Sequence, residues 1–223
     1  RDYLAVLQDK EIEAPTPHKT LVEKLKTLPN WRDFAFDKIH NRYLVIDCEK
    51  TDRLIVYEGG SQSELRLSPD PTSNINEHLL SSPEGIAVDE VGNIYVADWG
   101  NNRIAVFNDS GMFICAVTKG GNDGQSPLLL PTRVAIQVDR KGVPIDQERY
   151  GINRTYRDRY IIVADHNGVY RYDSHGNFVE RIIAPDSFSP SGYRALGVSG
   201  YGSATTMVLN DTRMTEPVVY TAK

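Results

Sequence analysis

The sequence lacks the marks of several protein classes. It has only two cysteines, Cys48 and Cys115, and no Cys-x-x-Cys pair, which excludes a zinc ribbon and a thioredoxin-type motif. The two thiols are either free or joined in one disulfide. No apolar run approaches the roughly 20 residues of a membrane-spanning helix, so no membrane span is expected. There is also no nucleophile elbow, no phosphate-binding glycine loop and no metal-ligand spacing of His or Cys residues. We therefore expect no cofactor and no metal, and an enzymatic function is not favoured.

Positive charge is scarce as well. The chain has 25 Lys and Arg against 30 Asp and Glu, a formal net charge of -5. Because nucleic-acid binding depends on clustered cations, we do not expect a nucleic-acid partner. The 40% hydrophobic and 25% charged residues are ordinary for a globular domain, and 223 residues suffice for one substantial core.

Many short segments of the chain alternate strictly between apolar and polar residues. "GIAVDEVGNIYVAD" (85–98) reads as two strands around a turn signal, the pattern of an antiparallel hairpin. The same pair recurs at 33–47, at 133–139 with 159–165, and at 195–200 with 205–211. A third alternating segment follows each pair, at 53–58, 103–108, 168–173 and 217–222. Three copies then continue into a fourth strand, at 59–68, 109–118 and 174–183.

The repeating unit is therefore a four-stranded antiparallel meander. Such sheets bury both faces when they stack radially, so the sequence predicts an all-β protein, a β-propeller of four-stranded blades. We place four blades at 31–68, 82–118, 131–183 and 194–223. Residues 1–30 would supply an N-terminal strand, a linker and a short helix, since 18–28 has leucines at helical spacing that would pack on the propeller disk.

The second copy resembles an NHL repeat. Residues 82–117 show Pro-x-Gly before the first strand, then "GNIYVAD", Asn-x-Arg-Ile and a closing Gly-x-Phe. The resemblance extends more weakly over 31–223 and implies a propeller. NHL propellers usually have six blades, whereas four copies are visible here. Either residues 2–8 close a ring of four as the missing last strand, or the chain is part of a larger propeller, or a neighbouring chain completes it.

Ligands of propellers commonly use the face where the turn after the second strand meets the loops between blades. Trp99 is the main candidate there, because an exposed tryptophan is a frequent binding hot spot. The alternative is that Trp99 packs against the next blade. The full set of binding candidates on this face is Trp99, Asn101, Asn102, His166, Asn167 and Arg213.

Three aspartates, Asp47, Asp98 and Asp165, recur at one place in the repeat. We interpret them as acceptors of hydrogen bonds from the following turn; a cation-binding ring of carboxylates is the alternative. Propellers related to the NHL family include calcium-dependent lactonases and the zinc-dependent amidating lyase. The metal ligands of these enzymes have no clear counterparts in this sequence. A metal-assisted hydrolase or lyase would need three or more of Asp47, Asp98, Asp165, His166 and Asn210 to converge.

An insertion at 141–160 interleaves arginine with tyrosine, a composition typical of protein interfaces. It is either a protein-binding protrusion or a solvated hairpin tip, and its candidate interface residues are Arg149, Tyr150, Arg154, Tyr156 and Arg157. Asn-x-Ser/Thr triplets begin at Asn108, Asn153 and Asn210 and fit glycosylation acceptors. They favour an extracellular or lumenal location, with a cytoplasmic one left open.

We therefore interpret the chain as a non-catalytic NHL-type propeller, a protein-interaction or scaffold module within a larger assembly built with protein partners or by self-association. The alternative is the metal-assisted propeller hydrolase or lyase. RNA binding, known for some NHL propellers, is a third hypothesis. The insertion has four arginines but no wider basic surface around them, which argues against it.

Overall fold

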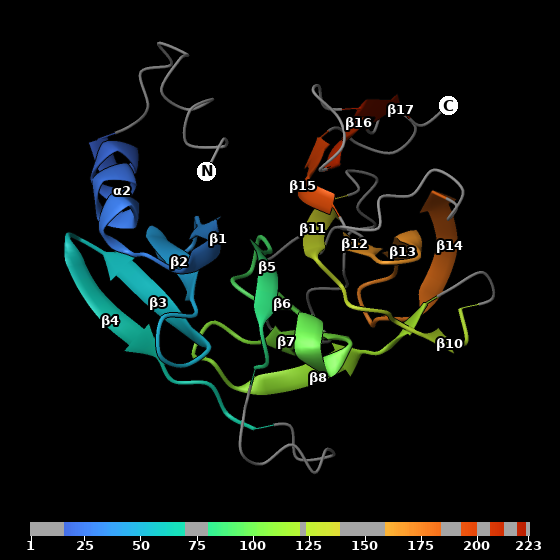
Figure 1. Ribbon diagram of the computed structural model, residues 1–223, viewed down its shortest axis with the longest axis horizontal. Coiled ribbons are helices and arrows are strands. Elements are labelled where there is room, and N and C mark those ends of the chain that lie inside the picture. Colours follow the sequence, from blue (N-terminus) through green and yellow to red (C-terminus); the bar gives the residue numbers. More distant parts are fainter. Residues whose placement is uncertain are drawn as a thin grey trace, which may run out of the picture.

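The computed structural model describes residues 16–69, 80–120, 124–138, 159–183, 193–199, 206–211 and 218–221. Four antiparallel sheets follow one another along the chain, which confirms the predicted all-β propeller blades (Figure 1). Blade 1 consists of β1 (Trp31–Asp37), β2 (Arg42–Asp47), β3 (Arg53–Glu58) and β4 (Ser61–Leu65). Blade 2 consists of β5 (Pro83–Val88), β6 (Ile94–Asp98), β7 (Arg103–Phe107) and β8 (Phe113–Val117).

Blade 3 and blade 4 continue the same order. Blade 3 contains β11 (Arg133–Val138), β12 (Arg159–Asp165), β13 (Gly168–Tyr172) and β14 (Phe178–Ile183). In blade 4 the described strands are β15 (Tyr193–Ser199), β16 (Thr206–Asp211) and β17 (Val218–Thr221). A short ribbon of β9 (Lys119–Gly120) and β10 (Ser126–Pro127) precedes blade 3.

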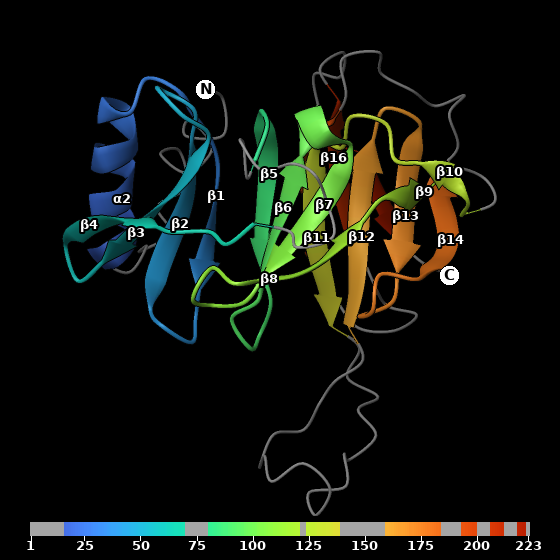
Figure 2. The same cartoon turned by 90° about the horizontal axis from the view of Figure 1, so that it is seen from below.

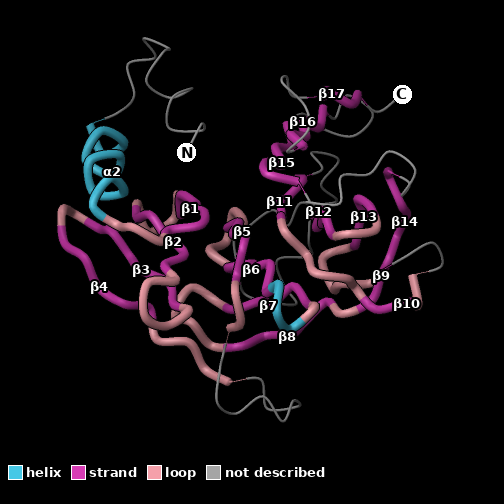
Figure 3. The backbone as a smooth tube through the Cα atoms, in the orientation of Figure 1, coloured by secondary structure: helices cyan, strands magenta, loops and turns pink. Residues whose placement is uncertain are grey.

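The blades fan out from a common centre, with the first strand of each blade innermost (Figures 1 and 3). Within the described residues the sheets do not close into a ring, and a gap separates blade 1 from blade 4 (Figure 1). Residues 2–8, one of the three alternatives for closing the ring, lie outside the described residues. Whether a larger propeller or a neighbouring chain completes the ring stays a prediction.

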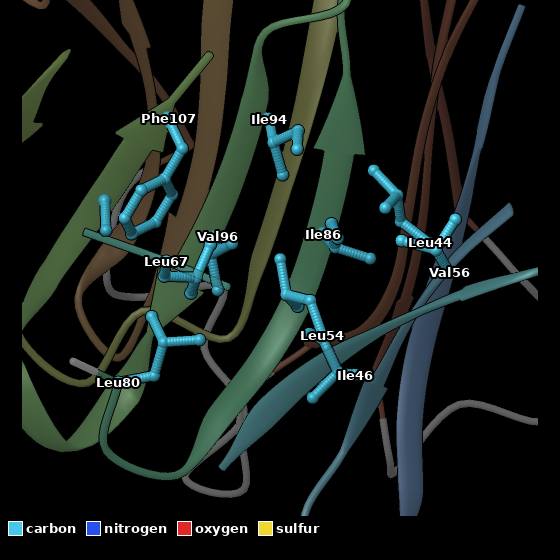
Figure 4. Close-up of a cluster of buried hydrophobic side chains, with 11 residues drawn as sticks. Leu44, Ile46, Leu54, Val56, Leu67, Leu80, Ile86, Ile94, Val96 and Phe107 are labelled. Carbon is cyan, nitrogen blue, oxygen red and sulfur yellow. The ribbon is translucent and has the colours of Figure 1, made fainter. Parts of the chain in front are cut away.

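Apolar side chains hold neighbouring blades together. Alternate residues of a strand point to opposite faces, so each sheet presents apolar side chains on both sides. The junction of blades 1 and 2 shows the result (Figure 4). Blade 1 contributes Leu44, Ile46, Leu54 and Val56, and blade 2 contributes Ile86, Ile94, Val96 and Phe107, all buried.

Gly85 lets the inner strands of blades 2 and 3 approach closely. A Cβ atom there would lie 2.8 Å from the carbonyl oxygen of Thr132 and 3.0 Å from Cα of Arg133. Any larger residue would push β5 away from β11. The glycine of the Pro-x-Gly motif is therefore a requirement of blade packing.

Polar contacts join the blades at the face opposite the predicted binding face, which we call the lower face. Between blades 1 and 2, Arg42 donates from Nε to Asp37 at 2.9 Å and from Nη2 to the carbonyl oxygen of Asp109 at 2.6 Å. His40 lies between the same residues, with Nδ1 2.7 Å from Asp37 Oδ2 and Nε2 3.3 Å from Asp109 Oδ2. The first turn of blade 1 is thus tied to the last turn of blade 2.

A buried ion pair ties blade 2 to blade 3. Arg159 of β12 donates from Nη1 to Asp89, which follows β5. Both side chains are nearly inaccessible to solvent. Asp89 also accepts hydrogen bonds from Asn93 at 2.9 Å and from the hydroxyl of Tyr95 at 3.1 Å. Burial and the Asp89 charge raise the pKa of Tyr95, so Tyr95 keeps the proton that it donates.

The predicted helix is present as α2 (Thr16–Thr27). It lies beside blade 1, on the side away from blade 2 (Figures 1 and 2). The predicted position on the propeller disk is thereby refined to the side of the first blade. Leu21 and Leu25 are buried there against blade 1. None of the helices in the described ranges is long and apolar enough to cross a membrane.

Replacing Arg159 with methionine would leave the Asp89 carboxylate buried without its cation. We expect the free energy of unfolding, measured by urea denaturation, to fall by about 3 kcal/mol, the scale for removing one partner of a buried ion pair. Lys26→Met is the control, because it breaks only the exposed pair with Glu23 and should cost less than about 1 kcal/mol. Equal losses in the two variants would contradict the inter-blade role of Arg159.

Asp37 makes the junction of blades 1 and 2 sensitive to acid. Burial alone would raise the pKa of Asp37, but hydrogen bonds from His40 and Arg42 outweigh it and hold this pKa below its ordinary value. The ionised carboxylate therefore stabilises the fold above the pKa of the unfolded chain, and this contribution is lost as the pH falls through the folded pKa. We expect the wild type to exceed Asp37→Asn in unfolding free energy at neutral pH, with the difference shrinking below about pH 4. A difference that stays constant on acidification would contradict this assignment.

Candidate functional site

The upper face of the blades carries the candidate site. Here the turn between the second and third strands meets the loop that enters the same blade, as the repeat predicts. In blade 2, the amide of Gly100 donates to the carbonyl oxygen of Ser81 at 2.7 Å. In blade 3, the amide of His166 donates to the carbonyl oxygen of Leu129 at 2.8 Å. In each blade, this hydrogen bond holds the turn against the entering loop.

The recurring aspartates organise these turns. Asp98 is fully buried and accepts from the amide of Ser81 at 2.7 Å, from Asn101 at 2.8 Å and from Arg103 Nε at 2.7 Å. Burial raises the pKa of Asp98, and these hydrogen bonds only partly offset that effect. These contacts join the turn to the loop that enters the blade, so the carboxylate acts as a support for the site.

Asp165 and Asp47 have the same role in their blades. Asp165 accepts from the amides of Leu129 at 2.9 Å, Asn167 at 2.6 Å and Gly168 at 3.0 Å. Burial raises the pKa of Asp165, against the effect of these bonds. Asp47 accepts from Arg53 at 2.7 and 3.0 Å. Each of the three carboxylates is hydrogen-bonded within its own blade. No group of three or more His, Cys, Asp or Glu side chains suited to a metal occurs among the described residues.

Trp99 lies on a rigid turn. It begins the 3₁₀ helix η1 (Trp99–Asn101), and Asn102 closes this turn in the left-handed conformation, with φ at 51°. Gly100 sits so close to Ser81 that a side chain there would collide with it. Although its backbone is held in this way, Trp99 keeps 36% of its surface exposed. The indole is therefore available to a partner.

Two leucines that the sequence analysis did not single out lie beside this turn. The amide of Leu130 donates to Asn102 Oδ1 at 2.8 Å, so the loop entering blade 3 is tied to the turn of blade 2. Leu129 is 39% exposed. The signal was present in the sequence as three leucines, 128–130, inside a loop, of which the first is buried.

We call Trp99, Asn102, Leu129, Leu130 and His166 the upper patch. The Asn102–Leu130 and Leu129–His166 hydrogen bonds connect its members across two blades. His166 is half-buried, and its Nδ1 has no hydrogen-bond partner in the described part of the chain. The patch presents exposed apolar surface from Trp99 and Leu129, whereas the unpaired His166 Nδ1 atom is itself buried.

The remaining predicted residues divide into two groups. Asn101 and Asn167 are in the upper-face turns, where both bond to the recurring aspartates. Asn108 caps the last turn of blade 2, since its Oδ1 accepts from the amides of Ser110 and Met112. Asn210 is in β16. The others lie outside the described residues: Arg149, Tyr150, Asn153, Arg154, Tyr156, Arg157 and Arg213.

Comparison with known proteins supports the repeat. The sequence model of the NHL repeat matches residues 80–107, which confirms the predicted NHL signature of blade 2. No curated protein matches the sequence. Among solved structures, hydrazine synthase from Kuenenia stuttgartiensis is similar, with a TM-score of 0.52 and 13% identity over 95% of this chain. This chain covers 47% of that one, so it spans about half its length, and the likeness shows the fold alone.

The Asn102 side chain is expected to hold the upper patch in shape. Asn102→Ala places a residue with a Cβ in a left-handed conformation and removes the bond to Leu130, so we expect a loss of about 1–2 kcal/mol in unfolding free energy. Asn102→Gly keeps the conformation and removes only the bond, so its loss should be smaller, at most about 1 kcal/mol. Thermal denaturation measures both.

A spectroscopic readout accompanies this pair. The chain has two tryptophans, so a Trp31→Phe background leaves Trp99 as the reporter. Acrylamide quenching of its fluorescence should increase in Asn102→Ala, because the turn that holds the indole loosens. If Asn102→Gly is destabilised as much as Asn102→Ala, the left-handed turn is not what Asn102 supplies.

Proposed function

We propose that this chain, an NHL-repeat β-propeller protein, is a non-catalytic interaction module that binds protein partners through the upper patch. The observation that carries the proposal is Trp99, a large aromatic side chain that stays 36% exposed on a turn whose backbone is held on both sides. Tryptophan at such positions dominates many protein interfaces. Because the turn is already ordered, it would lose little further conformational entropy when a partner binds.

The composition of the patch fits a peptide or protein surface better than a charged ligand. Trp99 and Leu129 supply exposed apolar area, and the exposed Asn102 side chain supplies polar groups beside it. No Lys or Arg belongs to the patch, and the chain carries a net charge of -5. These features support a protein partner over RNA, whose phosphates require cations.

The turn contacts also support a binding role over catalysis. Asp47, Asp98 and Asp165 accept hydrogen bonds from backbone amides or arginines of their own turns and, for Asp98 and Asp165, from the loops that enter the same blades. Acid–base or metal chemistry needs groups whose oxygens face a substrate. As part of the same proposal, the module belongs to a larger assembly, in an extracellular or lumenal setting that the three glycosylation triplets favour.

The test uses a random-peptide phage library panned against the whole chain. We expect the selected peptides to bind Trp99→Ala at least about 30-fold more weakly than wild type, the effect of losing a hot spot of 2 kcal/mol. Met112→Ala is the matched control, since Met112 is 57% exposed but lies in the β7–β8 turn on the lower face.

Two results would contradict the proposal. One is equal peptide binding by Trp99→Ala and wild type. The other is binding of a labelled RNA pool at low salt while no peptide is selected, because affinity would then come from phosphate contacts.

A further inference from the structure

The outermost strand of blade 2 differs in charge from the outermost strands of blades 1 and 3. Each of the three strands follows a turn whose glycine has a φ between 81° and 86°: Gly60 before β4, Gly111 before β8 and Gly176 before β14. The strands can therefore be aligned from these glycines. The fourth residue after the glycine is Glu64 in blade 1 and Glu180 in blade 3, but it is Cys115 in blade 2.

In blades 1 and 3 this glutamate forms an ion pair with the neighbouring strand. Arg53 Nη1 lies 3.4 Å from Glu64 Oε2, and Arg171 Nη2 lies 2.8 Å from Glu180 Oε1. In blade 2 the register instead places a valine of β7 opposite Cys115. Charged side chains on an edge strand discourage the addition of further strands, and β8 carries none.

β8 is apolar and partly exposed. Its sequence is Phe-Ile-Cys-Ala-Val, in which Ile114 is 51% exposed and Cys115 and Ala116 are half-buried. Uncharged segments with high β-propensity pair readily with other strands when they lie on a sheet edge. The composition of β8 therefore favours pairing with a further strand.

The main chain of β8 is open on the side away from β7, which we call the outer edge. β8 is the last strand of its sheet, so no strand in the described part of the chain pairs with this edge. The linker after β4 bonds to its beginning. The amide of Ser68 donates to the carbonyl oxygen of Gly111 at 2.8 Å, and the amide of Phe113 donates to Ser68 Oγ at 2.7 Å. The outer edge thus already accepts a hydrogen-bonded segment at one end.

We infer that the outer edge of β8 binds an extended, uncharged segment of a partner protein, which adds to blade 2 as a fifth strand. The occupant is a strand because the edge offers main-chain amides and carbonyl oxygens at the spacing of strand pairing. Main-chain hydrogen bonds hold the added strand, and Ile114 contacts its apolar side chains. Figure 1 shows β8 on the outer rim of blade 2. The inference is independent of the upper patch, and its failure leaves the proposed function intact.

The first experiment titrates the whole chain with one synthetic strand, acetyl-Thr-Val-Thr-Ile-Thr-Val-Thr-amide, and follows amide hydrogen exchange by NMR. In the free protein, the amides between Ile114 and Val117 that point away from β7 should exchange fast. They should become protected at about 1 mM peptide, where a site with a dissociation constant of this order is half-filled. The amides of β14 should stay unchanged.

Two results of this experiment overturn the inference. One is that the peptide protects no amide of β8. The other is that the outward amides are protected before the peptide is added, because the edge would then be occupied by another part of this chain or by a second copy.

The second experiment places a charge on the outer edge. Ile114→Lys should weaken binding of the same peptide about 10-fold, the effect of losing the burial of half an isoleucine side chain. Val179→Lys is the matched control, because Val179 is also the third residue after its glycine and is 45% exposed, but on β14. Its peptide binding should equal that of the wild type. Unchanged binding by Ile114→Lys overturns the inference, and so does an equal loss in both variants.

Discussion

Blades 1, 2 and 3 each have two apolar faces, and burying both is the constraint from which the rest of the structure follows. Strict alternation along a strand sends neighbouring side chains to opposite faces, so no blade is stable alone. Blade 2 meets the constraint by packing between blades 1 and 3. Among the described residues, blade 1 has a blade on one side, and α2 covers the other side. The radial arrangement, the close approach at Gly85 and the position of the helix are all consequences of the same requirement.

Polar groups obey a complementary constraint at the two ends of the strands. Strand pairing leaves the amides of the turns without partners, and an unpaired buried amide is costly. An aspartate at the end of the second strand resolves this at the upper face, because its carboxylate accepts two or three bonds while remaining buried, as Asp98 and Asp165 do. At the lower face, Asp37 and Asp89 do the same and also receive an arginine, Arg42 and Arg159. The lower-face arginines reach across blades, so the acids that shape the turns also fix the order of the sheets.

The strands could be predicted from the sequence because their signal is local. Period-two alternation, turn residues and the recurring Asp47, Asp98 and Asp165 all lie within one repeat, and the structure forms the strands that they predict. The contacts between repeats could not be predicted in this way. Arg159 and Asp89 are 70 residues apart, and the local sequence around neither residue indicates the other as its partner. The exposure of Leu129 depends on a bond between Leu130 and Asn102, 28 residues away. Likewise the spacing of Leu21 and Leu25 predicts an amphipathic helix, but not which face of which blade it covers.

The turn that carries Trp99 is held by contacts within its own repeat and by a contact to the next blade, while the tryptophan itself stays partly exposed. The turn is held from below by Asp98, which supports Asn101 and Arg103, and from the side by the Asn102–Leu130 bond to the next blade. Each of these contacts uses backbone or polar atoms, so none of them needs the indole ring. Trp99 keeps 36% of its surface exposed, and this free surface is the property on which a binding role for the upper patch depends.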